Sequence, residues 1–218
     1  MLLCYITDRN AFPGTEAERR SFVLRRIAEA ARAGVDYIQL REKDLSARDL
    51  EQLAREAVRA VRDNSPNSKL LINSRTDIAL ACDADGVHLP ADDLSASEVR
   101  AVWMKASSHP PLIGVSAHSL ADVRLAESHG ANFAVLAPIF EKPGTTVPAL
   151  SVQALREACS PDSSNAHRFF VLALGGVTLD NAGDCLAAGA SGLAGIRLFQ
   201  SGPVQETVQR LRALGSRQ

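Results

Sequence analysis

The stretch Ala33–Leu40, "AGVDYIQL", decides the fold because its order of residue types recurs along the chain. A helical segment ends, Gly or Asp makes the turn, a small residue and a polar residue follow, and an apolar strand begins. Glycine after a helix suits the left-handed C-terminal cap. The same order occurs in "CDADGVHL" (Cys82–Leu89), "HGANFAVL" (His129–Leu136) and "AGASGLAGI" (Ala188–Ile196).

Short apolar runs extend this unit to eight expected strands. Strands that alternate with helices, and that lack polar/apolar alternation, are typical of a parallel sheet covered on both faces. Eight strands predict an α/β fold, a (βα)8 TIM barrel, with a doubly wound open sheet as the alternative. The strands are expected at Leu3–Ile6, Tyr37–Leu40, Lys69–Ile72, Gly86–Leu89, Leu112–Val115, Phe133–Leu136, Phe169–Leu174 and Gly192–Ile196. Helical spacing is clear at Glu16–Ala33, Ala47–Arg62, Ala96–Lys105, Leu120–Ser128, Val152–Ala158 and Leu179–Ala187.

Composition narrows the class of protein. The 218 residues are 46% hydrophobic, and no shift in composition divides them, so one domain over residues 1–218 is expected. Lys and Arg (24) nearly balance Asp and Glu (25), and aromatics are 5%, which argues against a nucleic-acid or anionic-membrane surface. The four cysteines form no C-x-x-C pair, and no apolar run approaches a membrane span, so a reducing cytoplasm is expected.

A barrel builds its site at the carboxyl ends of its strands. After the second strand, Gln39, Arg41 and Lys43 alternate, so in an extended chain they face the same side. Arginine offers a planar fork for phosphate oxygens and lysine a compact charge. These residues therefore indicate a phosphate-binding wall; the alternative is that the two cations pair with Glu42 and Asp44.

A second anion site is expected after the seventh strand. Gly175 and Gly176 follow it, and Thr178 is the expected N-cap of the next helix, where free N–H groups would attract an anion. Arg197, at the end of the eighth strand, would add positive charge. The alternative is a tight turn that merely needs glycine.

Other strand ends carry further polar groups. Asp92 and Asp93 suit Mg²⁺, although they could instead cap the helix that starts near Ser95. His88 and His118 lie at different strand ends without a zinc-type spacing. Further candidates at strand ends are Asn73, Ser116, Lys142, Thr145 and Thr146.

Several of these segments together resemble the thiamin phosphate synthase/TenI superfamily over nearly the whole chain. The resemblance implies a (βα)8 barrel. It also implies a synthase that joins hydroxymethylpyrimidine diphosphate to a thiazole phosphate and releases pyrophosphate through a pyrimidine carbocation, with Mg²⁺ and cations stabilising the leaving group. The matching segments are "YITDR", "IQLREKDL", "INSRTDIALACDADGVHLPADDL", "IGVSAHSL", "APIF" and "ALGGVTLDNAGDCLAAGASGLAGI".

The resemblance also implies roles for individual residues. Arg41, Lys43 and Ser116 would act at the reacting groups, and Asp93 would ligate Mg²⁺. The diphosphate wall would comprise Gln39, Arg41, Lys43 and Asn73, and the thiazole phosphate would bind at Gly175, Gly176, Ile196 and Arg197. His88, Lys142, Thr145 and Thr146 complete the expected substrate-binding set.

Three departures leave a second activity open. Synthases usually have Asp where this chain has Ser74, Gly-Gln where it has Pro90-Ala91, and Thr-x-Thr-Lys where it reads "EKPGTTVP". The first two favour a TenI-like thiazole tautomerase, but the sixth loop lacks the histidine which that activity would use. A non-catalytic thiazole phosphate-binding protein is the third alternative, and the sequence leaves a homo-oligomer open.

Overall fold

Eight parallel strands close into a barrel in the computed structural model, which describes residues 1–141, 146–160 and 169–215. Neighbours in the sequence are neighbours in the sheet, and β8 pairs with β1, where Leu2 lies opposite Gly192. The (βα)8 prediction is therefore confirmed, and the open-sheet alternative is wrong. The strands are β1 Leu2–Ile6, β2 Tyr37–Leu40, β3 Lys69–Asn73, β4 Gly86–Leu89, β5 Leu112–Ala117, β6 Phe133–Leu136, β7 Phe170–Ala173 and β8 Gly192–Gly195.

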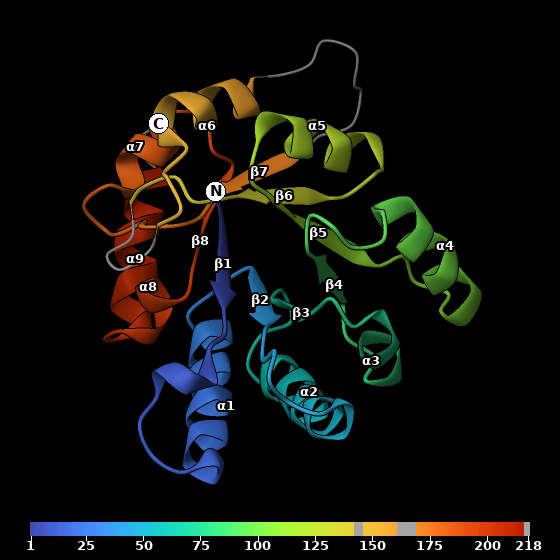
Figure 1. Cartoon of the computed structure of the whole chain (residues 1–218). Coiled ribbons are helices and arrows are strands. Elements are labelled where there is room, and N and C mark those ends of the chain that lie inside the picture. The colour runs from blue at the N-terminus through green and yellow to red at the C-terminus, as the bar shows by residue number, and fades with distance from the viewer. Residues whose placement is uncertain (142–145, 161–168, 216–218) are drawn as a thin grey trace.

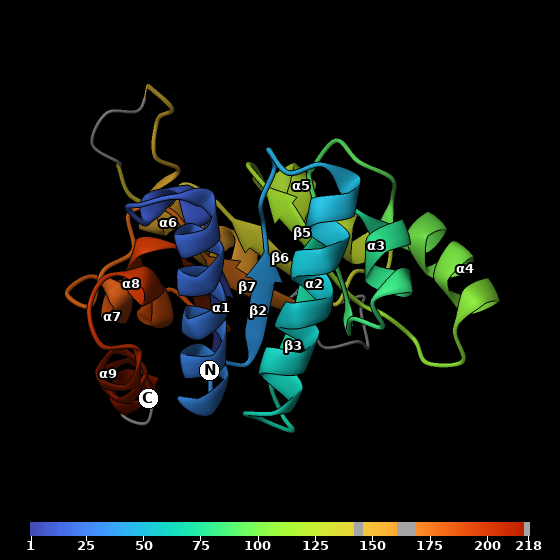
Figure 2. The ribbon, with the colours of Figure 1, turned by 90° about the horizontal axis from the view of Figure 1, so that it is seen from below.

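Helices form an outer layer around these strands (Figure 1), and α1 and α2 lie side by side over β2 (Figure 2). Helices α3, α8 and α9 were not expected from the sequence, and α3 and α8 are very short. The helices are α1 Glu16–Arg32, α2 Ala47–Arg62, α3 Thr76–Ala81, α4 Ala96–Ala106, α5 Leu120–Ser128, α6 Ser151–Cys159, α7 Ala182–Ala187, α8 Arg197–Gln200 and α9 Val204–Gly215, with a 3-10 turn at Arg9–Ala11.

The recurring turn has the expected conformation at all four places. Gly34, Asp83, Gly130 and Gly189 are left-handed, with φ of +87°, +56°, +75° and +98°. The next residue donates its N–H to the carbonyl five residues earlier, as in a Schellman cap. These bonds are Val35 to Ala30, Ala84 to Ala79, Ala131 to Ala126 and Ala190 to Cys185, at 3.0, 2.9, 3.0 and 3.1 Å.

The polar residue after each turn ties its strand to the preceding one. The backbone N–H of this polar residue donates to the carbonyl of one residue in the preceding strand. In three of the four turns, the side-chain oxygen of the polar residue also accepts the backbone N–H of that strand residue. The three side-chain bonds are Leu3 N to Asp36 Oδ2 at 2.7 Å, Leu70 N to Asp85 Oδ2 at 2.8 Å and Ile113 N to Asn132 Oδ1 at 2.8 Å. The repeat therefore fixes how β2, β4 and β6 begin.

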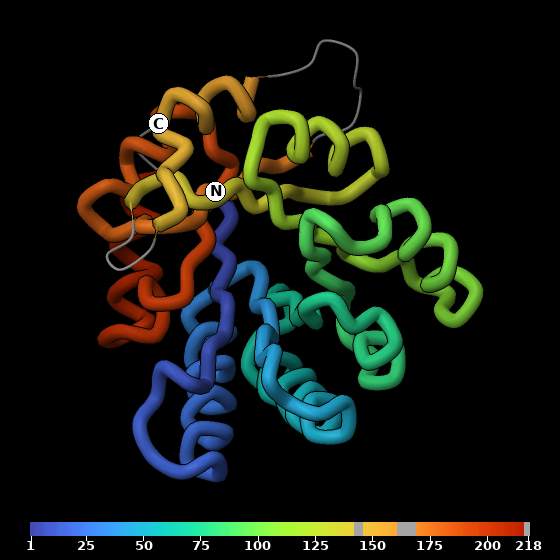
Figure 3. The backbone as a smooth tube through the Cα atoms, in the orientation of Figure 1, coloured from blue at the N-terminus to red at the C-terminus, as the bar shows by residue number. Residues whose placement is uncertain are grey.

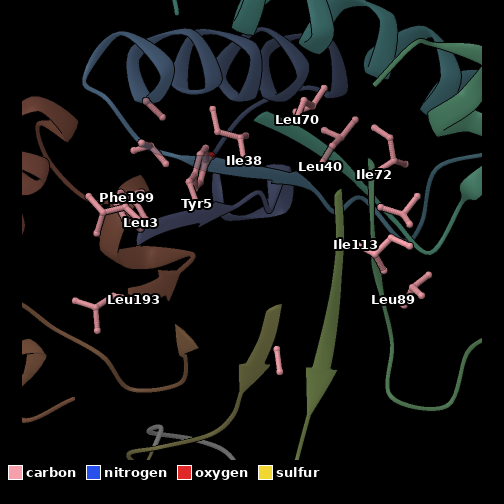
Figure 4. Packing of buried hydrophobic residues seen from close by; sticks show 14 of the residues in the cluster. Leu3, Tyr5, Ile38, Leu40, Leu70, Ile72, Leu89, Ile113, Leu193 and Phe199 are labelled. Atoms are coloured by element: carbon pink, nitrogen blue, oxygen red, sulfur yellow. The ribbon is translucent and has the colours of Figure 1, made fainter. Parts of the chain in front are cut away.

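Two apolar layers hold the barrel together. Side chains on the outer strand faces pack under the helices, as Leu3, Ile38, Leu70 and Ile113 do in Figure 4. The inner layer fills the barrel with Cys4, Ile6, Leu71, Phe133, Val135, Leu172 and Ala194. Because successive side chains point to opposite faces, these inner residues show which positions at the strand ends face the barrel axis.

Met1 and the last turn of α9 lie close together at the start of β1, where Arg212 of α9 donates to the carbonyl of Met1 and to that of Gly34; Figure 3 traces the backbone between them. Arg212 also pairs with Asp36 at 2.7 Å. Among the residues that the structure describes, no helix has the length and apolar character to cross a membrane.

Candidate active site

Four polar side chains at the carboxyl ends of β2 to β5 form a row inside the barrel. Gln39 lies opposite the inner-layer residue Leu71, and Asn73 lies two positions beyond Leu71. On the next strands, His88 pairs in register with Asn73, and Ser116 lies opposite the inner-layer residue Val135. Gln39 Nε2 donates to Asn73 Oδ1 at 3.0 Å, and His88 Nε2 lies 3.0 Å from Ser116 Oγ. The structure thus brings together four residues that the sequence placed on separate strands.

The facing wall of the barrel is apolar. It consists of inner-layer side chains from β6, β7, β8 and β1 and from the residues after β7 and β8, namely Val135, Leu172, Leu174, Ala194, Ile196 and Ile6. The interior at this end of the barrel is therefore polar on the side of β2 to β5 and apolar on the side of β6, β7, β8 and β1.

His88 is held neutral inside this row. It is 2% exposed, and burial together with the nearby charge of Arg41 lowers its pKa to about 4. Nδ1 is buried without a hydrogen-bond partner among the described residues. An orphaned N–H costs more than an orphaned lone pair, which favours the tautomer with hydrogen on Nε2. In that tautomer His88 donates to Ser116, whose own hydroxyl hydrogen is free to point at a ligand.

Arg41 and Lys43, at the end of β2, have no ion-pair partner in the part of the chain that the structure describes. The adjacent carboxylates of Glu42 and Asp44 are engaged by Arg9 instead, at 3.2 and 2.6 Å from its Nη1. The alternative that Arg41 and Lys43 pair with these two acids is therefore wrong. Both cations remain available at the mouth of the barrel.

Gly175 and Gly176 form a left-handed turn after β7, with φ of +94° and +66°. The expected N-cap is wrong: α7 begins at Ala182, because the Thr178 hydroxyl accepts from the N–H groups of Asp180 and Asn181 and closes a separate turn. A side chain on Gly176 would lie 2.7 Å from Phe140 Cβ and 2.9 Å from the carbonyl of Glu141. Glycine is required here by both conformation and space.

A cavity of about 680 Å³ opens beside this glycine turn. It extends from the turn across Ala194–Leu198 to α9, where Thr207 and Arg210 line it. Arg197 and Arg210 are exposed and have no ion-pair partner among the described residues. Two unpaired guanidinium groups in one cavity indicate an anion site. Arg210 was not identified from the sequence, because nothing there placed α9 beside the seventh and eighth strand ends.

Asp93 lies beside Ser74 at the ends of β3 and β4. Ser74 Oγ donates to Asp93 Oδ2 at 2.7 Å, and the N–H of Leu94 donates to Oδ1 at 2.8 Å. Ser95 caps α4 through a capping box with Glu98, so the alternative that Asp92 and Asp93 cap this helix is wrong. No cluster of three or more metal-binding side chains occurs among the described residues.

The remaining candidates lie elsewhere. His118, after β5, is exposed, and its Nδ1 lies 2.9 Å from the carbonyl oxygen of Ala137. Thr146 is exposed in the loop after β6. Lys142 and Thr145, expected in the same loop, lie outside the described residues.

The chain is similar to known proteins over most of its length. Residues 3–199 match the family model described as thiamine monophosphate synthase. A putative thiamine-phosphate synthase 2 of Aquifex aeolicus is 39% identical over 196 residues, which cover 89% of this chain and 95% of that protein. A thiamine-phosphate synthase of Chlorobium luteolum is 35% identical over 193 residues, covering 88% of this chain and 82% of that protein.

Solved structures extend the comparison to the fold. A thiamine phosphate pyrophosphorylase from Pyrococcus furiosus superposes with a TM-score of 0.79 and 25% identity, over 99% of this chain and 96% of that one. A 3-hexulose-6-phosphate synthase, with a TM-score of 0.65 and 18% identity over 98% of both chains, shares the barrel alone. The residues of the candidate site that lie beyond residue 199, Arg210 among them, are outside the family match.

Proposed function

The chain belongs to the thiamine monophosphate synthase family, and on this premise we propose that it is a thiamine-phosphate synthase. It joins hydroxymethylpyrimidine diphosphate to a thiazole phosphate and releases pyrophosphate. The observation that carries this proposal is the presence of two separate cationic positions at one barrel mouth, at Arg41 and Lys43 after β2 and at the glycine turn with Arg197 after β7 and β8. A reaction between two phosphorylated substrates needs both.

The polar row orients the pyrimidine between these positions. Gln39 and Asn73 present amide groups, and Ser116 presents a hydroxyl that His88 directs. Arg41 and Lys43 bind the diphosphate oxygens and stabilise the negative charge that grows as the carbon–oxygen bond to the diphosphate breaks. The thiazole, held by its phosphate at Gly176, Ile196 and Arg197, offers its ring nitrogen to the pyrimidine methylene carbon, and pyrophosphate leaves.

The residues present fit one Mg²⁺ ion that is shared with the substrate. Mg²⁺ is usually held by one or two carboxylates together with waters and substrate phosphates. Asp93 supplies the carboxylate, and Ser74, 2.7 Å away, supplies a neutral oxygen. When bound, the ion would neutralise charge on the departing diphosphate. Since only one carboxylate is available in this pair, the protein without diphosphate should bind Mg²⁺ weakly.

A thiazole tautomerase is the second candidate, and the neutral Ser74 beside Asp93 is the observation that favours it. Tautomerisation requires neither a diphosphate nor a metal ion. It does not explain why Arg41 and Lys43 are kept free of the acids beside them. A protein that binds thiazole phosphate without turnover would leave the same two cations without a role.

A Mg²⁺ titration of thiamine phosphate formation from both substrates tests the proposal. The parent protein should form product, Ser74→Asp should lower the Mg²⁺ concentration for half-maximal rate, and Asp93→Ala should nearly abolish the reaction. Asp92→Ala is the matched control, because Asp92 is an exposed carboxylate of the same loop, and it should resemble the parent. If neither the parent nor Ser74→Asp forms product at any Mg²⁺ concentration, the synthase assignment fails and tautomerase activity should be measured.

A further inference from the structure

The residues after β2 alternate in charge, Arg41-Glu42-Lys43-Asp44. These four residues lie beyond Leu40, the last residue of β2, so strand alternation does not keep each cation apart from the carboxylate next to it. Ion pairs between them would occupy the groups that a diphosphate needs. The structure avoids this arrangement through a third residue, Arg9, which follows β1 and is only 4% exposed.

Arg9 is saturated by carboxylates. Its Nη1 and Nη2 donate to the two oxygens of Asp44 at 2.6 and 2.8 Å, and Nη1 also donates to Glu42 Oε2 at 3.2 Å. Its Nε donates to Glu16 at 2.7 Å. The Asp44 carboxylate, although partly exposed, has its pKa held well below the usual range by these bonds from Arg9. One guanidinium thus engages three acids at once.

Glu42 is held by the same arginine and by Thr7. It is 4% exposed, and burial raises its pKa while hydrogen bonds from Thr7 and Arg9 act against that rise. The Thr7 hydroxyl donates to Glu42 Oε1 at 2.6 Å and accepts the N–H of Arg41 at 3.0 Å. The bond network that holds the carboxylate therefore also fixes the backbone from which the Arg41 side chain extends.

We propose that Arg9 is a positioning residue that keeps Glu42 and Asp44 off Arg41 and Lys43, so that both cations stay free for a diphosphate. Arg9 itself does not touch the substrate. Asp44 and buried Glu42 lose their ion pairs when the charge of Arg9 is removed. Both are then free to compete for the cations next to them in the sequence, Arg41 and Lys43. A diphosphate would then have to displace a carboxylate before it could bind. This inference rests on the proposed function for the identity of the ligand, not for the geometry.

Calorimetry of inorganic pyrophosphate binding in the presence of Mg²⁺ tests the proposal without turnover. Arg9→Met keeps the aliphatic stem and removes the charge, and it should weaken pyrophosphate binding roughly tenfold or more. In the complete reaction the same variant should raise KM for the pyrimidine diphosphate more than it lowers kcat. Arg59→Met, which removes an exposed arginine of α2, is the control and should bind as the parent does.

Rescue separates charge placement from a purely structural role. Combining Arg9→Met with Glu42→Gln and Asp44→Asn removes the liberated charges and should recover most of the lost affinity, whereas a merely structural defect would persist. If Arg9→Met does not fold, Arg9→Lys and Arg9→Lys with Asp44→Asn ask the same question, because one ammonium cannot hold both acids. The proposal is overturned if the folded single variant at Arg9 binds pyrophosphate as the parent does. It is also overturned if neutralising the acids in that variant does not recover the affinity for pyrophosphate. Recovery without any thiamine phosphate formation would leave it standing and remove the proposed function instead.

Discussion

His88 couples the interior of the barrel to the hydroxyl of Ser116. Its ring is 2% exposed and tilted against Phe133, with 5.9 Å between ring centroids. Gly114 opposite leaves no room for a larger residue, since a side chain there would lie 2.8 Å from His88 Nδ1. The ring is therefore fixed, and so is the direction of its bond to Ser116. A fixed neutral donor prepares the hydroxyl before the substrate arrives.

The burial of His88 predicts a stability change with pH. Its folded pKa of about 4 lies below the ordinary 6.5, so the unfolded chain binds the proton more readily, and stability is lost as pH falls from 6.5 towards 4. Between pH 7 and pH 5 the free energy of unfolding should fall by about 2 kcal/mol more in the parent than in His88→Gln. Urea unfolding at both values measures this difference. Equal losses in the two proteins would mean that His88 titrates normally.

The segments after β7 and β8 line one cavity together with α9. The glycine turn supplies left-handed backbone, Arg197 follows two residues after the end of β8, and α9 brings Arg210 to the same cavity from ten residues beyond the end of α8. Gly176 is a poor position for mutation, because any side chain there meets Phe140 and Glu141. The arginines are better probes, since both are exposed and neither supports the strand ends.

Replacing Arg210 should weaken phosphate binding without loss of fold. Arg210→Gln keeps a long, helix-compatible side chain and removes the charge, so affinity for inorganic phosphate and for the thiazole phosphate should fall several-fold. The alcohol that lacks the phosphate should bind the two proteins alike. Arg59→Gln on α2 is the charge-matched control. Calorimetry that finds the same phosphate affinity in Arg210→Gln and Arg59→Gln would place Arg210 outside the site.

The barrel as a whole is a fourfold repeat of two strands and two helices. Each repeat ends one helix with the same left-handed turn and opens an even-numbered strand with a polar residue bonded to the strand before it. Asp36, Asp85 and Asn132 occupy equivalent places and accept equivalent N–H groups. Hydrogen bonds at the amino end of the barrel thus join neighbouring strands, while the carboxyl end carries the candidate site.

Because these three residues are equivalent, we can predict which substitutions at Asn132 preserve the stability of the barrel. Asn132→Ala leaves the N–H of Ile113 without its side-chain acceptor and should lower the free energy of unfolding by about 1–3 kcal/mol. Asn132→Asp should cost much less, because a carboxylate makes this bond at the two earlier turns. Asn67→Ala, at an exposed position, is the control. Urea titration that gives Asn132→Ala and Asn132→Asp the same loss would contradict the equivalence.

Local pattern was enough to predict the barrel and the polar row. The helix–turn–strand order of Ala33–Leu40 is a short-range signal, and Gln39 lies inside the barrel because side chains alternate along a strand. The expected alternation does not extend to Arg41 and Lys43, because β2 ends at Leu40 and Lys43 lies in a turn. The carboxylates held by Arg9 could not be predicted this way, because the contact joins residues 35 positions apart. Arg210 and the self-closed turn at Thr178 were missed for a similar reason: each depends on packing between segments rather than on the spacing within one.

The separate placement of the two cationic positions has a stereochemical consequence. In the closed order of eight strands, β2, after which Arg41 and Lys43 stand, is two steps from β8 and three from β7. With the two phosphorylated groups held apart in this way, the thiazole nitrogen would approach the methylene carbon from the side away from the departing oxygen. A pyrimidine diphosphate made chiral at this carbon with one deuterium should give thiamine phosphate of inverted configuration. Racemic product would mean that the pyrimidine carbocation rotates in the site before the thiazole nitrogen adds to it.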